Sequence, residues 1–113
     1  MQLSQILNST ETLKKLSNED LPAKTAYRIG KAIKEVNAEL EQFEETKRKL
    51  FEKYGEEVEG QLQIKQENAQ DFQKEFNDLL KEEVTIECNI DLDDLENVKL
   101  KPIEINNIDF LIS

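Results

Sequence analysis

The sequence PAKTAYRIGKAIKEVNAELEQFEETKRKLFEKY, residues 22–54, decides the fold of this chain. Its apolar residues recur at alternating steps of three and four for about nine turns, at Ala26, Ile29, Ile33, Val36, Leu40, Phe43, Leu50 and Tyr54. Lys47 takes the one charged position in this apolar seam. The pattern predicts a single amphipathic helix of roughly 50 Å. Because that length exceeds the diameter of a compact domain of this size, we expect a partner helix to cover part of the seam.

A first, shorter helix is predicted before the long one. Leu3, Ile6 and Leu13 approximate the helical period, which favours a helix over residues 3–17. The polar run that follows stops this helix, and Pro22 suits the first turn of the next one because its missing N–H would be unpaired there. Within the long helix, the glycine at position 30 predicts a close backbone contact.

A returning helix is predicted after the long one. Gly55 should end the long helix in the left-handed conformation, and residues 56–60 read as a polar turn. Residues 61–65 alternate polar and apolar side chains, which is typical of a short strand or extended arm. Asn68 could cap a second amphipathic helix through about Glu83, with an apolar face that should fold back on the long helix as a hairpin. That face carries Ala69, Phe72, Phe76, Leu79 and Leu80.

The clearest strand signal lies near the end of the chain. Residues 84–90 alternate apolar and polar side chains, which predicts a strand with one buried face. Residues 91–96 resemble a capped helical turn, residues 98–101 a short strand stopped by Pro102, and residues 105–112 either a helix or a strand.

These elements predict one domain of mainly α class with a small β element (α+β). A chain of 113 residues can bury one modest core, so no second domain is expected. The predicted parts of the domain, residues 1–113, are an N-terminal helix and corner (1–20), the long helix (21–55), the returning helix (67–83) and a strand-containing C-terminal region (84–113).

The composition bounds the cellular setting. Cys88 is the single cysteine and cannot form an internal disulfide, and no basic-then-apolar segment opens the sequence. We therefore expect synthesis in a reducing cytosol. The longest apolar run is Phe110-Leu111-Ile112, far short of the roughly 20 residues that span a bilayer. An integral membrane protein is not expected.

Charge is unevenly placed along the chain. The net charge is −10, with +3 on residues 1–34 and −13 on the remainder. Net acidity argues against direct binding to a phosphate backbone, which needs several Lys or Arg contacts. It permits the opposite idea, that the chain competes with nucleic acid for a basic protein surface.

The sequence carries no signature of catalysis, and we predict no catalytic, cofactor-binding or metal-binding residue. Histidine is absent, which removes the commonest general base and transition-metal ligand. The three glycines are far apart, so no phosphate-binding loop is present. The chain is therefore interpreted as non-enzymatic and without a cofactor.

Three weaker patterns have ordinary structural interpretations. Residues 91–96 begin like a calcium loop, but Leu95 and Glu96 replace a ligand and the turn glycine, which favours helix capping. Cys88 falls in the apolar register of the predicted strand, so it is interpreted as a core residue. A basic stripe on the long helix could touch phosphate or an acidic partner, although a solvated polar face is the favoured interpretation. The stripe consists of Lys24, Arg28, Lys31 and Lys34.

The chain also carries motifs that resemble a family of small tailed-bacteriophage proteins of uncharacterised function. The resemblance covers nearly the whole chain and rests on Leu21-Pro22-Ala23-Lys24-Thr25-Ala26-Tyr27-Arg28-Ile29, Phe43-Glu44-Glu45, Lys53-Tyr54-Gly55-Glu56, Phe72-Gln73-Lys74-Glu75-Phe76 and Glu83-Val84-Thr85-Ile86. In that family an opening helix, a long charged helix ending in Tyr-Gly, a returning helix and a short C-terminal strand region follow in the same order. The resemblance implies phage origin and assigns no functional residue.

The leading hypothesis is a phage protein that acts through protein–protein contacts in virion assembly or as a structural adaptor. Lys47 within the seam could set register or oligomeric state, or lie with its stem along apolar surface and its amine in water. The residues predicted to bind a partner are Ile33, Val36, Leu40, Phe43, Lys47 and Leu50.

The alternative hypothesis is an acidic inhibitor that mimics nucleic acid and occupies a host defence or nucleic-acid-binding protein. It would use an acidic helix face formed by Glu41, Glu44 and Glu45. Under either hypothesis we expect a protein partner from phage or host, a homo-oligomer being one form of this contact. The expected location is the cytoplasm of the infected host or the virion, without membrane association or direct nucleic-acid binding.

Overall fold

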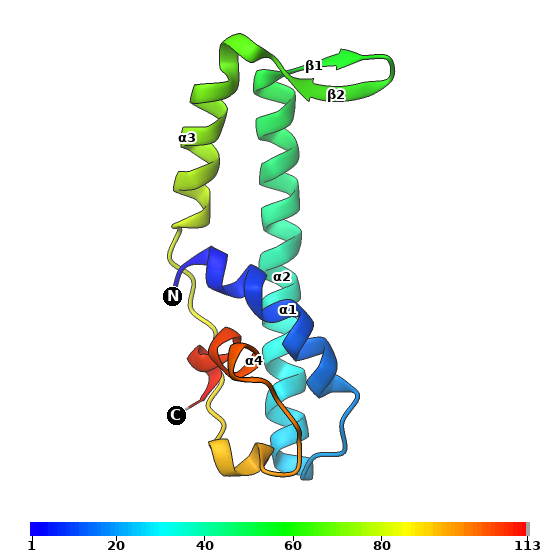
Figure 1. The fold of residues 1–113 in the computed structure, drawn as a ribbon, viewed down its shortest axis with the longest axis vertical. Coiled ribbons are helices and arrows are strands. Elements are labelled where there is room, and N and C mark those ends of the chain that lie inside the picture. Colours follow the sequence, from blue (N-terminus) through cyan, green and yellow to red (C-terminus); the bar gives the residue numbers. More distant parts are fainter. Residues whose placement is uncertain (113) are drawn as a thin grey trace.

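The computed structural model describes residues 1–112 as an elongated, mainly helical molecule with one small sheet (Figure 1). Its extents are 52 × 26 × 23 Å. This confirms the predicted class of a mainly α protein with a small β element. In chain order the elements are α1 (Leu3–Ser17), α2 (Ala23–Tyr54), β1 (Gly55–Val58), β2 (Gln61–Ile64), η1 (Gln66–Asn68), α3 (Ala69–Leu80), η2 (Leu92–Leu95), α4 (Pro102–Asn107) and η3 (Asp109–Leu111).

The long helix α2 runs the length of the molecule, and the chain itself covers both of its halves (Figure 1). Helix α1 crosses the first half, while α3 returns along the second half as the predicted hairpin. The expectation that a partner helix covers the seam is therefore corrected: an elongated chain can line a long helix with its own elements. The buried face also starts one residue earlier than predicted, because Thr25 is buried and Ala26 is exposed.

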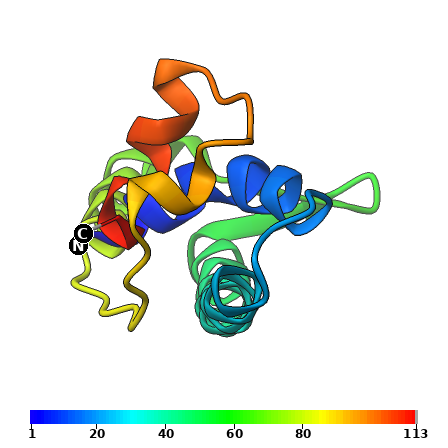
Figure 2. The same ribbon diagram turned by 90° about the horizontal axis from the view of Figure 1, so that it is seen from below.

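The core lies around the first half of α2. Viewed along the long axis, α1 lies between α2 and α4 (Figure 2), and α1 contacts both helices. Burial of apolar side chains from α1, α2 and the C-terminal region stabilises this half of the molecule. The largest fully buried apolar side chains are Ile6, Leu16, Ile29, Val36, Ile90, Ile108 and Leu111.

The segment after α3 is extended but forms no strand in the described residues. The predicted alternation is present, since Val84, Ile86 and Ile90 are buried while the residues between them are exposed or half-buried. However, its ladder contacts are limited to single bridges, Gln2 with Glu83 and Ile90 with Ile112. The predicted strand is therefore wrong. Side-chain burial against helices, rather than pairing with another strand, sets the period of two here.

The rest of the described C-terminal region contains short helical elements and no strand. Residues 98–101 form no strand, and Pro102 begins α4 instead of ending a strand. A proline at the first helical position has no N–H to leave unpaired, so it initiates a helix well. The two alternatives for residues 105–112 resolve into the end of α4 and the 3-10 turn η3, with a single bridge at Ile112.

The second strand of the sheet, β2, confirms the short strand predicted over residues 61–65, whereas β1 lies where a polar turn was predicted. Gly55 is extended (φ −101°, ψ 172°) rather than left-handed, so α2 passes directly into β1. A β-carbon at Gly55 would lie 2.9 Å from the carbonyl oxygen of Gln63, which explains a glycine at this junction. The positive φ angles of Glu59 (53°) and Gly60 (79°) form a two-residue hairpin turn that joins β1 to β2.

Two further expectations concern helix geometry. No atom lies within 4 Å of a β-carbon placed at Gly30, so the predicted close backbone contact is wrong. The returning helix is shorter than predicted, because η1 precedes it and the chain leaves α3 at Lys81.

Within residues 1–112, no helix combines the length and the hydropathy needed to cross a bilayer.

Candidate protein-binding groove

The residues predicted to bind a partner divide into core and partly accessible positions. Val36 is 2% exposed and Phe43 is 6% exposed, and both belong to the chain's own core. Ile33 and Leu40 pack against that core but stay half-buried. Leu50, at the far end of the seam, is also half-buried. A partner can therefore reach Leu40 and its neighbours without unfolding, whereas it cannot reach Val36 or Phe43.

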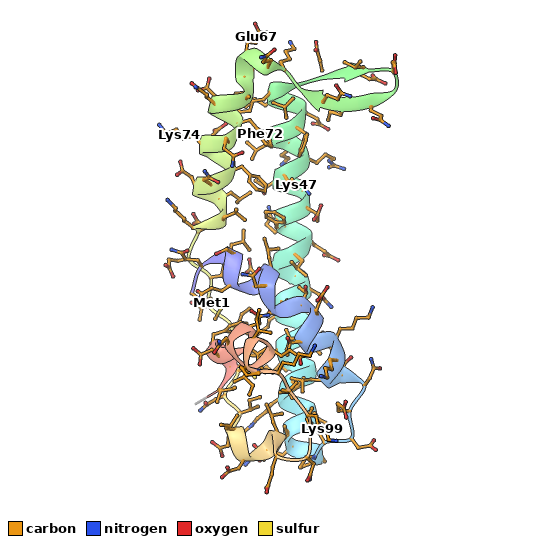
Figure 3. All side chains as sticks on the ribbon, in the orientation of Figure 1. Met1, Lys47, Glu67, Phe72, Lys74 and Lys99 are labelled. Atoms are coloured by element: carbon orange, nitrogen blue, oxygen red, sulfur yellow. The ribbon has the colours of Figure 1, made fainter. Side chains whose placement is uncertain are left out.

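Aromatic side chains join α2 to α3 around Lys47. The ring centroids of Phe43 and Phe76 are 6.1 Å apart, and those of Phe51 and Phe72 are 5.1 Å apart, with Phe72 pointing toward α2 in Figure 3. The Lys47 amine lies 6.0 Å from the Phe43 ring centroid, and the residue is half-buried. This arrangement favours a Lys47 stem that lies along apolar surface with its charge near a ring face.

An open groove of about 900 Å³ follows the α2 surface beyond α1. The residues that line it are Asn37, Leu40, Glu41, Glu44, Glu45 and Arg48. The acidic face proposed from the sequence, Glu41, Glu44 and Glu45, thus lies in one groove with Leu40 from the apolar seam. The two sets of residues that supported rival hypotheses are brought together here.

Beside the groove lies a smaller, more apolar pocket of about 280 Å³ between α1 and α2. Leu40 and Asn37 line both spaces, so the two are neighbours on the surface. Leu13 from α1 and Ile33 from α2 supply apolar wall, and Lys14 lies at its edge. A ligand could place an apolar side chain in this pocket and polar groups along the acidic part.

The carboxylates of the groove are largely uncompensated. Glu45 pairs with Lys49 at 3.7 Å along the same helix, an exposed i,i+4 contact that is weak in water. Within residues 1–112, neither Glu41 nor Glu44 forms an ion pair. Because these two charges are exposed, they remain available to Lys or Arg from another molecule.

The sequence predicted the groove's three carboxylates and Leu40 as binding residues, but it did not predict Asn37 and Arg48, which line the same face of α2. Asn37, Glu41, Glu44 and Arg48 repeat at steps of four, three and four, so a polar stripe was visible in the sequence. The apolar pocket could not be found this way, because it depends on how α1 crosses α2. Crossing geometry is a tertiary property that neither helix specifies alone.

A second, basic groove of about 640 Å³ lies at the start of α2. It contains three residues of the predicted basic stripe, and the extended chain forms the opposite wall. The lining residues are Lys24, Tyr27, Arg28, Lys31, Ile86, Glu87, Cys88 and Asn89.

The thiol of Cys88 at this groove is half-buried and packs against the core, as predicted. Burial is the main cause that raises the pKa of the thiol, and the nearby Glu35 carboxylate raises it further. A thiol held protonated is a poor nucleophile. Among residues 1–112, no three carboxylate or thiol groups lie close enough together to hold a metal ion.

The end of the α2–α3 hairpin carries a small polar cluster. The Lys53 amine lies 3.4 Å from the Glu75 carboxylate and 4.9 Å from the Tyr54 ring centroid. A hydrogen bond with Tyr54 and a weaker one with Lys53 lower the pKa of the Glu75 carboxyl. Hydrogen bonds with Tyr54 and Glu75 raise the pKa of the Lys53 amine. These exposed contacts tie the helix ends together and show no acid–base pair poised near neutral pH.

Comparison of the chain with protein-family models, curated protein sequences and solved structures found no significant match in any of the three.

Proposed function

We propose that this chain is a non-enzymatic phage protein that acts by protein–protein contact, holding a basic segment of its partner in the groove along α2. The observation that carries this proposal is that the acidic groove and the apolar pocket between α1 and α2 lie side by side and share Asn37 and Leu40. Phage origin is supported by the sequence resemblance alone, and the groove supports the kind of contact.

The chemistry of the groove defines the segment that it would accept. Lys or Arg side chains would meet Glu41 and Glu44, while an apolar side chain one or two turns away would enter the pocket beside Leu13 and Leu40. A basic amphipathic helix has this combination of groups. The desolvated apolar contact would supply affinity, and the carboxylates would supply orientation and rapid association.

The role that fits this contact best is an adaptor or assembly factor, because the groove has an apolar anchor as well as charge. The acidic-inhibitor role is favoured by a different observation, namely that Glu41 and Glu44 are exposed without ion-pair partners among residues 1–112. An inhibitor that mimics nucleic acid would depend on those charges far more than on Leu40.

A pull-down from infected cells, repeated at low and high salt, tests both roles. Leu40→Ser should release the partner of an adaptor at both salt concentrations, because it removes the apolar anchor. Glu41→Lys with Glu44→Lys should release the partner of an inhibitor, whose binding should already fall steeply with salt. The matched charge control is Asp78→Lys with Glu82→Lys, on exposed positions of and after α3.

The proposal predicts that Leu40→Ser causes the larger loss and that the control retains the partner. If only the paired glutamate reversal releases the partner, the inhibitor role replaces the adaptor role. Retention of the partner by both groove variants would refute binding through this groove.

A further inference from the structure

The basic groove at the start of α2 combines three cations with an exposed ring. Tyr27 is 74% exposed, and it lies between Lys24 and Arg28 on the helix surface. The Arg28 Nη1 atom donates to the carbonyl oxygen of Asn89 at 3.0 Å, which fixes the extended wall against α2. The backbone N–H of Glu87 donates to the carboxylate of Glu35 at 2.9 Å and holds the same wall about two turns further along α2.

One cation of this groove, Lys24, lies in the first turn of α2, where a helix disfavours positive charge. The N-terminal end of α2 carries the positive end of the helix dipole, and its first turn contains no acidic residue. Within residues 1–112, Lys24 and Lys31 form no ion pair. An acidic group seated in the groove would therefore be attracted both by these side chains and by the dipole.

The opposite end of α2 carries an arm of opposite charge. The β1–β2 hairpin projects from the helical body (Figure 1), and every residue from 56 to 63 is exposed. It presents Glu56, Glu57 and Glu59, none of which forms an ion pair within residues 1–112. Val58 at its tip is 38% exposed. A two-stranded hairpin without cover is marginally stable in water, so a surface that covers this arm would stabilise it.

One face of the hairpin matches the basic groove. Leu62 lies beside Gly55, at the junction with α2, so its face of the sheet points toward the helix end. Glu56 and Val58 alternate with these residues and therefore share the other face. That free face offers one carboxylate and one branched apolar side chain, which suit the cations and the exposed Tyr27 ring of the groove.

We propose that the basic groove binds the acidic β1–β2 hairpin of a second copy of this chain. The hairpin cannot reach its own groove, because about 36 Å of rigid helix separates Lys31 from Gly55. The contact therefore forms between copies, with the hairpin of one in the basic groove of another. This inference uses residues other than those of the α2 groove and does not depend on the function proposed for it.

Sedimentation velocity at low ionic strength over a range of concentrations tests this association. The unaltered chain should sediment faster as concentration rises. The groove variant, Lys24→Glu with Lys31→Glu, and the arm variant, Glu56→Lys with Glu59→Lys, should each associate with themselves about tenfold or more weakly. An equal mixture of the two variants should associate again, because the basic arm of one fits the acidic groove of the other.

Two charge-matched controls separate specific docking from general repulsion. Lys74→Glu with Lys81→Glu matches the groove variant, and Asp78→Lys with Glu82→Lys matches the arm variant. Lys74 lies on the side of α3 away from α2 (Figure 3). Both controls should associate like the unaltered chain, and circular dichroism should show unchanged helix content in all four variants. A monomer at every concentration, a mixture that fails to associate, or controls that weaken association as much as the variants would each overturn the proposal.

Discussion

Replacement of Phe43 by alanine tests how much the α2–α3 hairpin depends on its aromatic contacts. In the half of α2 that α3 covers, Phe43 is the one buried side chain among the described residues of the two helices, at 6% exposed. Its ring centroid lies 6.1 Å from that of Phe76. A buried Phe→Ala change costs about 3–5 kcal/mol. Because Phe76 is half-buried and can relax into the space, we expect the lower part of this range, about 3 kcal/mol.

Urea unfolding followed by far-UV circular dichroism measures this change. The variant should unfold at a lower urea concentration, with the slope of the transition unchanged if unfolding stays two-state. Tyr27→Ala is the control, because that ring is 74% exposed and its removal should change the free energy of unfolding by about 0.5 kcal/mol or less. A Phe43→Ala loss below about 1 kcal/mol would refute the packing described for the hairpin.

Three other outcomes follow from the structure. Glu104 accepts from the Lys101 N–H at 2.9 Å and from the Lys15 amine, and these bonds lower its pKa below the unfolded value. Its contribution to stability is thus present above the unfolded pKa and lost as pH falls through the folded pKa, so Glu104→Gln should destabilise the chain at neutral pH and much less in acid, as measured by urea unfolding at both pH values. Gly60→Ala should cost about 1–2 kcal/mol in the same assay, because φ is 79° at that residue. Hydrogen exchange followed by NMR should show faster opening of α3, which has no fully buried residue among those described, than of α1 around Ile6.

The helices were predictable because each carries its own periodic signal. The bounds of α1 agree with the predicted residues 3–17, and α2 ends at Tyr54 as expected. The period of two at residues 84–90 was real but misleading. A segment clamped between helices also buries alternate side chains, and only the presence of a neighbouring strand separates the two cases.

The first strand of the sheet, β1, was missed for a different physical reason. Glu56, Glu57 and Glu59 are poor strand formers and give no apolar face, so the sequence read as a polar turn. The backbone decides otherwise, because Glu59 and Gly60 adopt the left-handed angles of a tight hairpin turn. The groove likewise was only partly predictable from the sequence. Its charges follow the helical period, whereas the pocket that Leu40 lines exists because α1 crosses α2 at that point.

The fold and the charge distribution together explain why both proposed contacts use charge to select the partner. Folding buries Val36 and Phe43 of the apolar seam within the chain. The apolar surface left to a partner is small and scattered, at Leu40 in one groove and at Tyr27 in the other. Small apolar anchors give modest affinity, so the charges beside them must select the partner and its orientation. The same helix thus offers basic side chains in its first turns and acidic ones in its middle, which lets one rigid element present two surfaces of opposite sign.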